Sequence, residues 1–177
     1  MAVYTIDPAH SSAHFSVRHM MISNVKGEFT KLSGTVAFDA ANPGASKVDV
    51  TIDVASLHTR DDQRDGHLKS ADFLDAEKYP LIKFVSASVQ SDGHDEYLVK
   101  GDLTIHGVTH EVDLHVEGPT PEVKDPWGNI KAGATASAKI NRKDFGLVWN
   151  VGLEAGGVLV GEEVKINIEV ELTRSAS

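Results

Sequence analysis

The sequence predicts an all-β protein, an extended eight-stranded antiparallel barrel with one short helical segment at about residues 60–75. Apolar and polar residues alternate with a period of two through most of the chain, as is typical of strands that bury one face. Glycine, aspartate, asparagine and proline interrupt this alternation at short intervals, so we expect tight turns between successive strands. Closing such strands into a barrel leaves no exposed sheet edge.

The first strands are expected between Asp7 and Phe38. Up to Phe29 the inward set of apolar residues and glycines falls on odd numbers, and from Leu32 onward it falls on even numbers. We interpret this one-residue shift as a β-bulge that bends a continuous strand, as happens where a sheet curls into a barrel. The same face includes His19, whereas a tightly packed interior favours branched aliphatic residues. This mixed face indicates a wall that surrounds either protein or ligand.

Later strands alternate as clearly. They are expected at residues 47–56, 80–89, 97–106, 110–118, 131–140 and 163–172. In the strand at 131–140 the inward positions Ala132, Ala134, Ala136 and Ala138 are all small, which leaves space inside an eight-stranded barrel for one small ligand. The alternative is that a helix or a bulky neighbour packs against these alanines.

One segment, residues 58–80, lacks the strand pattern. Thr59 is its expected N-cap, and acidic residues follow in the first turn. We predict a helix of roughly ten residues followed by a helical turn. Its apolar anchors are Leu68, Phe73 and Leu74, and it would plug or cover one end of the barrel.

The composition is ordinary for a globular protein, with 41% hydrophobic and 24% charged residues. The length suits one domain over residues 1–177. Without cysteine the chain has no disulfides and no thiol nucleophile. A net charge of −9 disfavours nonspecific binding to nucleic acid or to an anionic membrane. No apolar run reaches the ~18 residues of a membrane helix, so we expect no stable membrane insertion. The first residues show no signal peptide, so we expect a cytoplasmic location.

Two segments of the sequence partly match metal-binding motifs, but neither match is complete. The histidines of HEVDLH, residues 110–115, lie five apart on an expected strand, so they point to opposite faces and cannot share a metal. Residues 61–72 partly match a calcium loop, but an amide stands third and an aspartate twelfth. The sequence contains no nucleophile elbow, phosphate-binding loop or dinucleotide fingerprint. We therefore expect neither catalytic residues nor a metal site nor a cofactor.

Nine histidines are more than usual. His10, His14 and His19 follow one strand region, where four residues span ~13 Å, too far for a shared metal. His106 and His110 flank a tight turn and could face each other, although surface pairs of this kind are usually solvated. His19 lies on the inward face, either as a hydrogen-bonded core residue or as a ligand contact.

Several regions together match a known pattern. They are residues 6–20 (IDPAHSSAHFSVRHM), 25–39 (VKGEFTKLSGTVAFD), 58–84, 101–112 (GDLTIHGVTHEV), 141–146 (NRKDFG) and 161–172 (GEEVKINIEVEL). In this order, across nearly the whole length, the chain resembles the YceI-like family of lipocalin-like isoprenoid-binding proteins. The resemblance implies a lipocalin-like barrel with a helix around a long apolar pore. It also implies a polyprenyl, quinone-like or fatty-amide lipid in the pore, and a homodimer.

Inward positions, the helix anchors and the NRKDFG turn predict what would line that pore. The expected ligand-binding residues are Phe15, Val17, His19, Phe29, Leu32, Val36, Phe38, Val50, Ile52, Leu68, Phe73, Leu74, Ile82, Phe84, Leu103, Ile105, Leu114, Ala134, Ala136 and Phe145. At a polar mouth we expect His19, Arg64, His67 and Arg142, of which the arginines suit a phosphate. For Arg142 the alternative is a structural corner with a local ion pair. A tail burying on the order of 500 Å² would gain ~12 kcal/mol gross and would dominate the affinity.

Three hypotheses follow for the function. The leading one is a non-catalytic carrier for an isoprenoid-type lipid. The second is a metal- or histidine-dependent lipid-modifying enzyme that uses His19, His67 and nearby carboxylates. The third is a stress-related interaction protein with a solid barrel, in which bulky side chains would fill the space beside the alanines of residues 132–138.

Overall fold

The structure is a computed structural model that describes residues 1–154 and 157–175. Within these residues it has one sheet, one α-helix and four short 3₁₀ turns. The strands are β1 (Ala2–Ile6), β2 (Ser12–His19), β3 (Ser23–Phe29), β4 (Leu32–Phe38), β5 (Lys47–Asp53), β6 (Leu57–His58), β7 (Leu81–Ser91), β8 (Glu96–Ile105), β9 (Val108–Glu117), β10 (Val123–Lys124), β11 (Ile130–Asn141) and β12 (Val160–Arg174). The helix is α1 (Asp62–Lys69), and the 3₁₀ turns are η1 (Pro8–His10), η2 (Pro43–Ala45), η3 (Val54–Ser56) and η4 (Arg142–Phe145).

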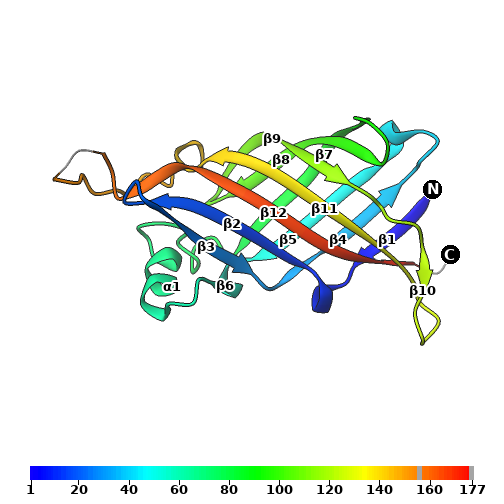
Figure 1. Cartoon of the computed structure of the whole chain (residues 1–177), viewed down its shortest axis with the longest axis horizontal. Coiled ribbons are helices and arrows are strands. Elements are labelled where there is room, and N and C mark those ends of the chain that lie inside the picture. The colour runs from blue at the N-terminus through cyan, green and yellow to red at the C-terminus, as the bar shows by residue number, and fades with distance from the viewer. Residues whose placement is uncertain (155–156, 176–177) are drawn as a thin grey trace.

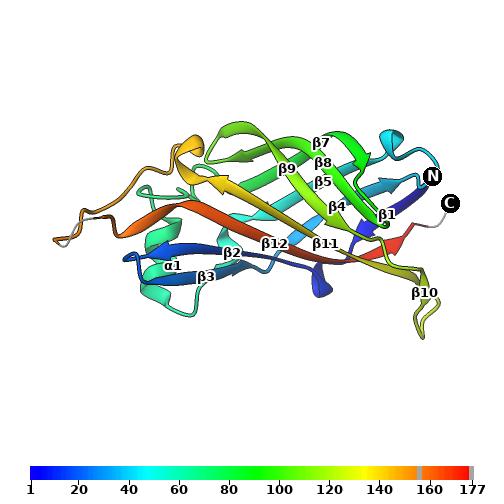
Figure 2. The same cartoon turned by 45° about the horizontal axis from the view of Figure 1, so that its top comes forward.

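Eight strands close into an antiparallel barrel, which confirms the predicted fold class (Figure 1). Around the ring they are β1, β4, β5, β7, β8, β9, β11 and β12, and β12 pairs back onto β1. Three further strands extend this wall: β2 pairs with β12, β3 with β2, and β6 with β3. The barrel is elongated, and α1 lies at the end opposite the two chain termini (Figures 1 and 2).

The predicted β-bulge between Phe29 and Leu32 is wrong in form. The chain leaves strand geometry at residues 30–31, so two strands, β3 and β4, carry the two phases of the pattern. Their partner is interrupted at the same level, because η1 separates β1 from β2 while β1 pairs with β4 and β2 with β3. The register shifts occur instead in the pairings of β7 with β8 and of β12 with β2. The chain is thus interrupted on both sides of this antiparallel pairing, between β1 and β2 and between β3 and β4.

The helix begins later than the predicted cap. The side chain of Asp61 accepts a hydrogen bond from the Arg64 N–H at 3.0 Å, so Asp61 is the N-cap and the prediction of Thr59 is wrong. Thr59 instead donates its N–H and its hydroxyl to the buried carboxylate of Asp65. After α1 the chain continues in turns at residues 71–74 and 76–78, close to the expected helical segment. Among the described residues, no helix has the length and apolar character needed to cross a membrane.

One end of the barrel is packed solid. Tyr4, Ile6, Leu32 and Leu172 are almost fully buried there, and Phe38 packs edge-on against Tyr97 with ring centroids 5.3 Å apart. Ala132 lies opposite Leu172 in the β11–β12 pairing, so at this level bulky neighbours do pack against the alanine strand. The other end, near α1, is hollow.

Candidate ligand-binding site

A cavity of about 540 Å³ fills the α1 end of the barrel. Most of its lining is apolar, and it comes from β2, β3, β5, β7, β8, β9, β11 and β12 together with α1 and the segment after η4. This size lies within the range of pockets that enclose most of a small organic ligand. The inward face of a strand supplies a residue at every second position, so long alternating strands generate such a wall directly.

Seventeen of the predicted site residues line this cavity. They are Phe15, Val17, His19, Phe29, Val50, Ile52, Arg64, His67, Leu68, Phe73, Leu74, Ile82, Phe84, Leu103, Ile105, Leu114 and Arg142. Both alternating strands and helix anchors therefore face the same space. Their contact with a ligand stays a prediction.

Six predicted residues lie elsewhere. Leu32, Val36, Phe38, Ala134, Ala136 and Phe145 are not part of the cavity lining. All but Ala136 belong to the packed interior or lie against it. The ring of Phe145 turns toward His110, with centroids 5.4 Å apart. Sequence parity assigns a strand residue to the inward face but carries no information about its level along the barrel axis, which explains the five strand residues. Phe145 lies in η4, where strand parity does not apply.

The aromatic part of the wall depends on a glycine. Phe15 and Phe29 pack with ring centroids 5.6 Å apart. A Cβ on Gly27 would overlap the Phe15 ring and crowd the Thr59 methyl group. Glycine at this position therefore lets the Phe15 ring approach the backbone of β3 closely.

The polar lining gathers at the α1 end. His14, Arg18, His19, Asp61, Gln63, Arg64, His67 and Arg142 are its members. Arg64 donates from Nε to the Thr59 hydroxyl at 2.9 Å and from Nη2 to the Thr59 carbonyl oxygen. A guanidinium has five N–H donors, so three remain for a ligand or water. Burial would raise the pKa of Asp65, but its hydrogen bonds from Thr59 outweigh this effect and lower the pKa.

Arg142 holds the chain beside the mouth. Its guanidinium donates to the carbonyl oxygens of Leu147, Trp149, Val160 and Gly161, and its side chain is almost fully buried. Burial lowers the pKa of Arg142, which nevertheless remains a cation in proteins. Four of its five donors are used, so the structure supports the corner alternative for this residue more than the role of a head-group contact. The ion pair of this corner is formed by the neighbouring Lys143 with Glu162 at 2.7 Å, whereas carbonyl oxygens surround Arg142.

An aromatic cluster borders the mouth. The rings of His67 and Trp149 lie edge to face at 4.8 Å, and Phe73 completes the triangle at 5.1 and 5.3 Å from them. His67 is also hydrogen bonded to Asp72 at 3.0 Å. The cluster joins α1 and its following turn to the segment after η4.

Known proteins share both the sequence pattern and the fold of this chain. A family model described as YceI-like domain matches residues 4–172. The chain belongs to the YceI-like family. Protein YceI of Escherichia coli is 41% identical over 172 residues, which cover 96% of this chain and 86% of that protein. The crystal structure of BcnA from Burkholderia cenocepacia matches with a TM-score of 0.77 at 27% identity, over 94% of this chain and 98% of that one.

A second solved structure has the same fold. It is a polyisoprenoid binding domain from Saccharophagus degradans implicated in plant cell wall breakdown, with a TM-score of 0.65 over 97% of this chain and 98% of that one. Its identity to this YceI-like chain is 17%, so the likeness concerns the fold alone.

Trp149 and Arg18 are among the residues at the mouth of this YceI-like barrel that sequence reasoning missed. Trp149 follows the last predicted turn in a stretch without strand alternation, and Arg18 has the outward parity of β2. Both nevertheless line the cavity. Arg18 lies near the last residue of β2, and Trp149 lies in the segment after η4, which also contributes to the lining. A signal for Trp149 was available, since a tryptophan in a glycine-rich apolar stretch is uncommon outside a core or a binding site.

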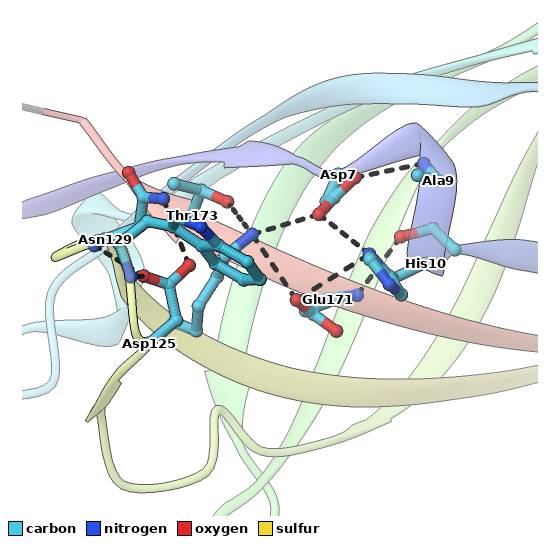
Figure 3. Close-up of polar contacts among 10 residues, drawn as sticks. Asp7, Ala9, His10, Asp125, Asn129, Glu171 and Thr173 are labelled. Atoms are coloured by element: carbon cyan, nitrogen blue, oxygen red, sulfur yellow. Dashed lines mark hydrogen bonds and ion pairs between the residues drawn. The ribbon is translucent and has the colours of Figure 1, made fainter.

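An ion-pair network lies outside the barrel wall, where η1 interrupts the first strand. The ligand atoms of Asp7, His10 and Glu171 lie within 4.8 Å of one another, a spacing that could hold a metal (Figure 3). The ammonium of Lys131 already lies between the carboxylates, 2.9 Å from Asp7 and 3.3 Å from Glu171, and it also donates to the Thr173 hydroxyl. Hydrogen bonds from Lys131 and His10 lower the pKa of Asp7 to about 2. The internal cation makes this a structural network.

Proposed function

We propose that this protein is a non-catalytic carrier that holds one isoprenoid-type lipid in the barrel cavity. The observation that carries the proposal is the cavity itself, apolar along the strands and polar only at the α1 end. Such a division suits a ligand with a long apolar tail and one polar head. The polyisoprenoid binding domain of similar fold adds support for this ligand class.

The tail would supply most of the affinity and the mouth would orient the head. Each apolar Å² removed from water contributes roughly 25 cal/mol, part of which offsets the freedom lost on binding. Arg64, with three remaining donors, and the exposed Arg18 are the cations best placed for an anionic or carbonyl head group. Arg142 would act on the head only through the segment that it holds.

The two other hypotheses fit less well. An enzyme would use the histidines of the mouth, but the His67 ring is already engaged with Asp72, Phe73 and Trp149. A solid barrel does not fit a cavity of about 540 Å³ beside Ala138. Stoichiometric metal, or lipid turnover that His19→Ala abolishes while binding persists, would favour the enzyme.

The direct test is extraction of the purified protein followed by mass spectrometry of the extract. We expect a lipid of several hundred daltons, at a molar ratio near one, with a prenyl-type fragmentation pattern. Binding of dansyl-farnesol to lipid-stripped protein, measured by fluorescence, provides the quantitative assay. Absence of any co-purified lipid together with no dansyl-farnesol binding would contradict the proposal.

Two further expectations belong to the same proposal. The homodimer is checked by light scattering on the purified chain, and the cytoplasmic location by cell fractionation. Neither one alters the binding assay, because the cavity is formed by a single chain.

A further inference from the structure

The cavity mouth is bordered by an exposed apolar tip. We use this term for residues 20–22, at the turn between β2 and β3, and for the described part of residues 147–159, after η4. The large exposed side chains of the tip are Met20, Met21, Ile22, Val148 and Val151. These two segments contain one charged side chain, Glu154, in a chain of which 24% is charged.

The two segments of the tip are packed against each other. The Met20 N–H donates to the Leu159 carbonyl oxygen at 2.8 Å, and Gly157 lies against the Met21 side chain. The second segment is itself folded back, since Leu159 N–H donates to the Val151 carbonyl oxygen at 2.9 Å. The exposed apolar side chains therefore belong to one ordered surface.

This surface is continuous with the cavity. Trp149 and Leu159 from one segment line the cavity mouth, and so does His19, which directly precedes the other segment. Both segments lie at the same end of the barrel as α1 (Figures 1 and 2). An apolar path thus leads from the outside of the tip to the inside of the barrel.

The backbone of the turn points to a role beyond folding. Met20 and Met21 adopt φ angles of +52° and +64°. Glycine and asparagine adopt this left-handed conformation at lower cost, and hairpin turns prefer them. Two exposed methionines therefore occupy positions where neither burial nor turn geometry favours them. A cost of this kind that persists at an exposed position is an indication of function.

We infer that the tip docks on the surface of a phospholipid bilayer, with the cavity mouth facing the membrane. This inference rests on the proposed function, because it describes where the lipid enters and leaves. Reversible binding to the membrane interface strengthens with the apolar area that is buried there and with the attraction of nearby cations to anionic lipids. Arg18 supplies that cation beside the tip, its guanidinium bonded to the Met21 carbonyl oxygen at 3.0 Å.

A bilayer fits this surface better than a second copy of the chain. A stable dimer interface buries about 20–30 residues on each side. The tip consists of two narrow turns, with five large exposed apolar side chains among its described residues. A tip of this size suits a soft, extended apolar phase.

The experiment compares two tip variants with a matched control. Met20→Asn/Met21→Gly keeps the left-handed turn with residues that favour it, so the fold is preserved. Ile22→Glu places a charge at the tip. The control is Val123→Glu, because Val123 is 63% exposed, close to the 75% of Ile22, but lies in β10 at the opposite end of the barrel.

Each protein is floated with vesicles of phosphatidylcholine and phosphatidylglycerol, and dansyl-farnesol binding is measured separately in vesicle-free buffer. We expect the wild-type chain and Val123→Glu to float with the vesicles, and the bound fraction to fall about tenfold in both tip variants. All four proteins should bind dansyl-farnesol equally, since the cavity is unchanged.

Two results would overturn the inference while leaving the proposed function intact. In the first, dansyl-farnesol binds but the wild-type chain does not float, or the tip variants float as well as it does. In the second, light scattering shows a dimer that the tip variants dissociate, which assigns the tip to a second copy. Failure of all proteins to bind dansyl-farnesol, together with the absence of any co-purified lipid, would instead overturn the proposed function, and this inference with it.

Discussion

The Nη1 atom of Arg142 donates a hydrogen bond to the carbonyl oxygen of Trp149 at 3.0 Å. The same side chain reaches Leu147, Val160 and Gly161, so one buried cation fixes both ends of the segment that closes the cavity mouth. The conformation of the segment at the mouth is therefore stabilised by Arg142, whose guanidinium donates to backbone carbonyl oxygens.

Replacing Arg142 should destabilise the protein. Arg142→Lys keeps the charge but cannot bond four carbonyl oxygens at once, so we expect the free energy of unfolding to fall by about 2–4 kcal/mol. Urea denaturation measures this change. The control is Lys143→Met, at an exposed ion pair with Glu162, which should stay within about 0.5 kcal/mol of wild type. Equal effects of the two substitutions would contradict the role of Arg142.

Filling the cavity should weaken lipid binding without harming the fold. Ala138 lines the cavity, and Ala138→Leu places a larger side chain there. We expect the Kd for dansyl-farnesol to rise about tenfold or more, with the free energy of unfolding changed by less than about 1 kcal/mol. Ser137→Leu, the neighbour on the outer face of β11, is the matched control and should bind as wild type. Unchanged affinity of Ala138→Leu would show that the ligand lies elsewhere.

The Asp7–Lys131 pair should make stability depend on pH in the acid range. The pKa of Asp7 is lowered from an ordinary 3.8 to about 2, so its contribution is complete above the ordinary value and is lost as the pH falls through about 2. Asp7→Asn keeps the acceptor for the Ala9 N–H but removes the charge. We expect this variant to be less stable by about 1 kcal/mol at pH 7, because water screens the pair.

The measurement for Asp7→Asn is a series of urea denaturations between pH 7 and pH 2. The difference from wild type should shrink toward zero at the lowest pH. A difference that stays constant over this range would mean that packing, and not charge, is responsible.

The Thr59 hydroxyl should matter more than its methyl group. Thr59 Oγ1 donates to the buried carboxylate of Asp65 and accepts from Arg64. Thr59→Val leaves that carboxylate short of one donor, and we expect the free energy of unfolding to fall by about 1–3 kcal/mol. Thr59→Ser keeps the hydroxyl and serves as the control in the same thermal and urea unfolding experiments. If the serine variant is as unstable as the valine variant, the hydrogen bond is not the cause.

The strand pattern predicted much of this molecule correctly. Alternation with period two is a local property that each strand carries in its own residues, so the inward faces of β5, β8 and β12 were accessible from the sequence. Turn positions were recognisable for the same reason. The N-cap of the helix was harder to predict, because Thr59, Asp61 and Asp62 are all residue types that suit an N-cap. In the structure Thr59 is hydrogen bonded to the buried Asp65, and Asp61 caps the helix.

The sequence by itself determined the barrel, its inward faces and, through the resemblance of its motifs, its YceI-like family. Only the tertiary structure decided that Phe38 and Ala134 lie at the packed end while Phe15 and Ala138 line a cavity. Level along the barrel axis follows from the register and stagger between strands, which are distant in the chain. The directions of the Arg142 donors and the place of Trp149 were decided in the same way, because both depend on how the ends of the barrel close.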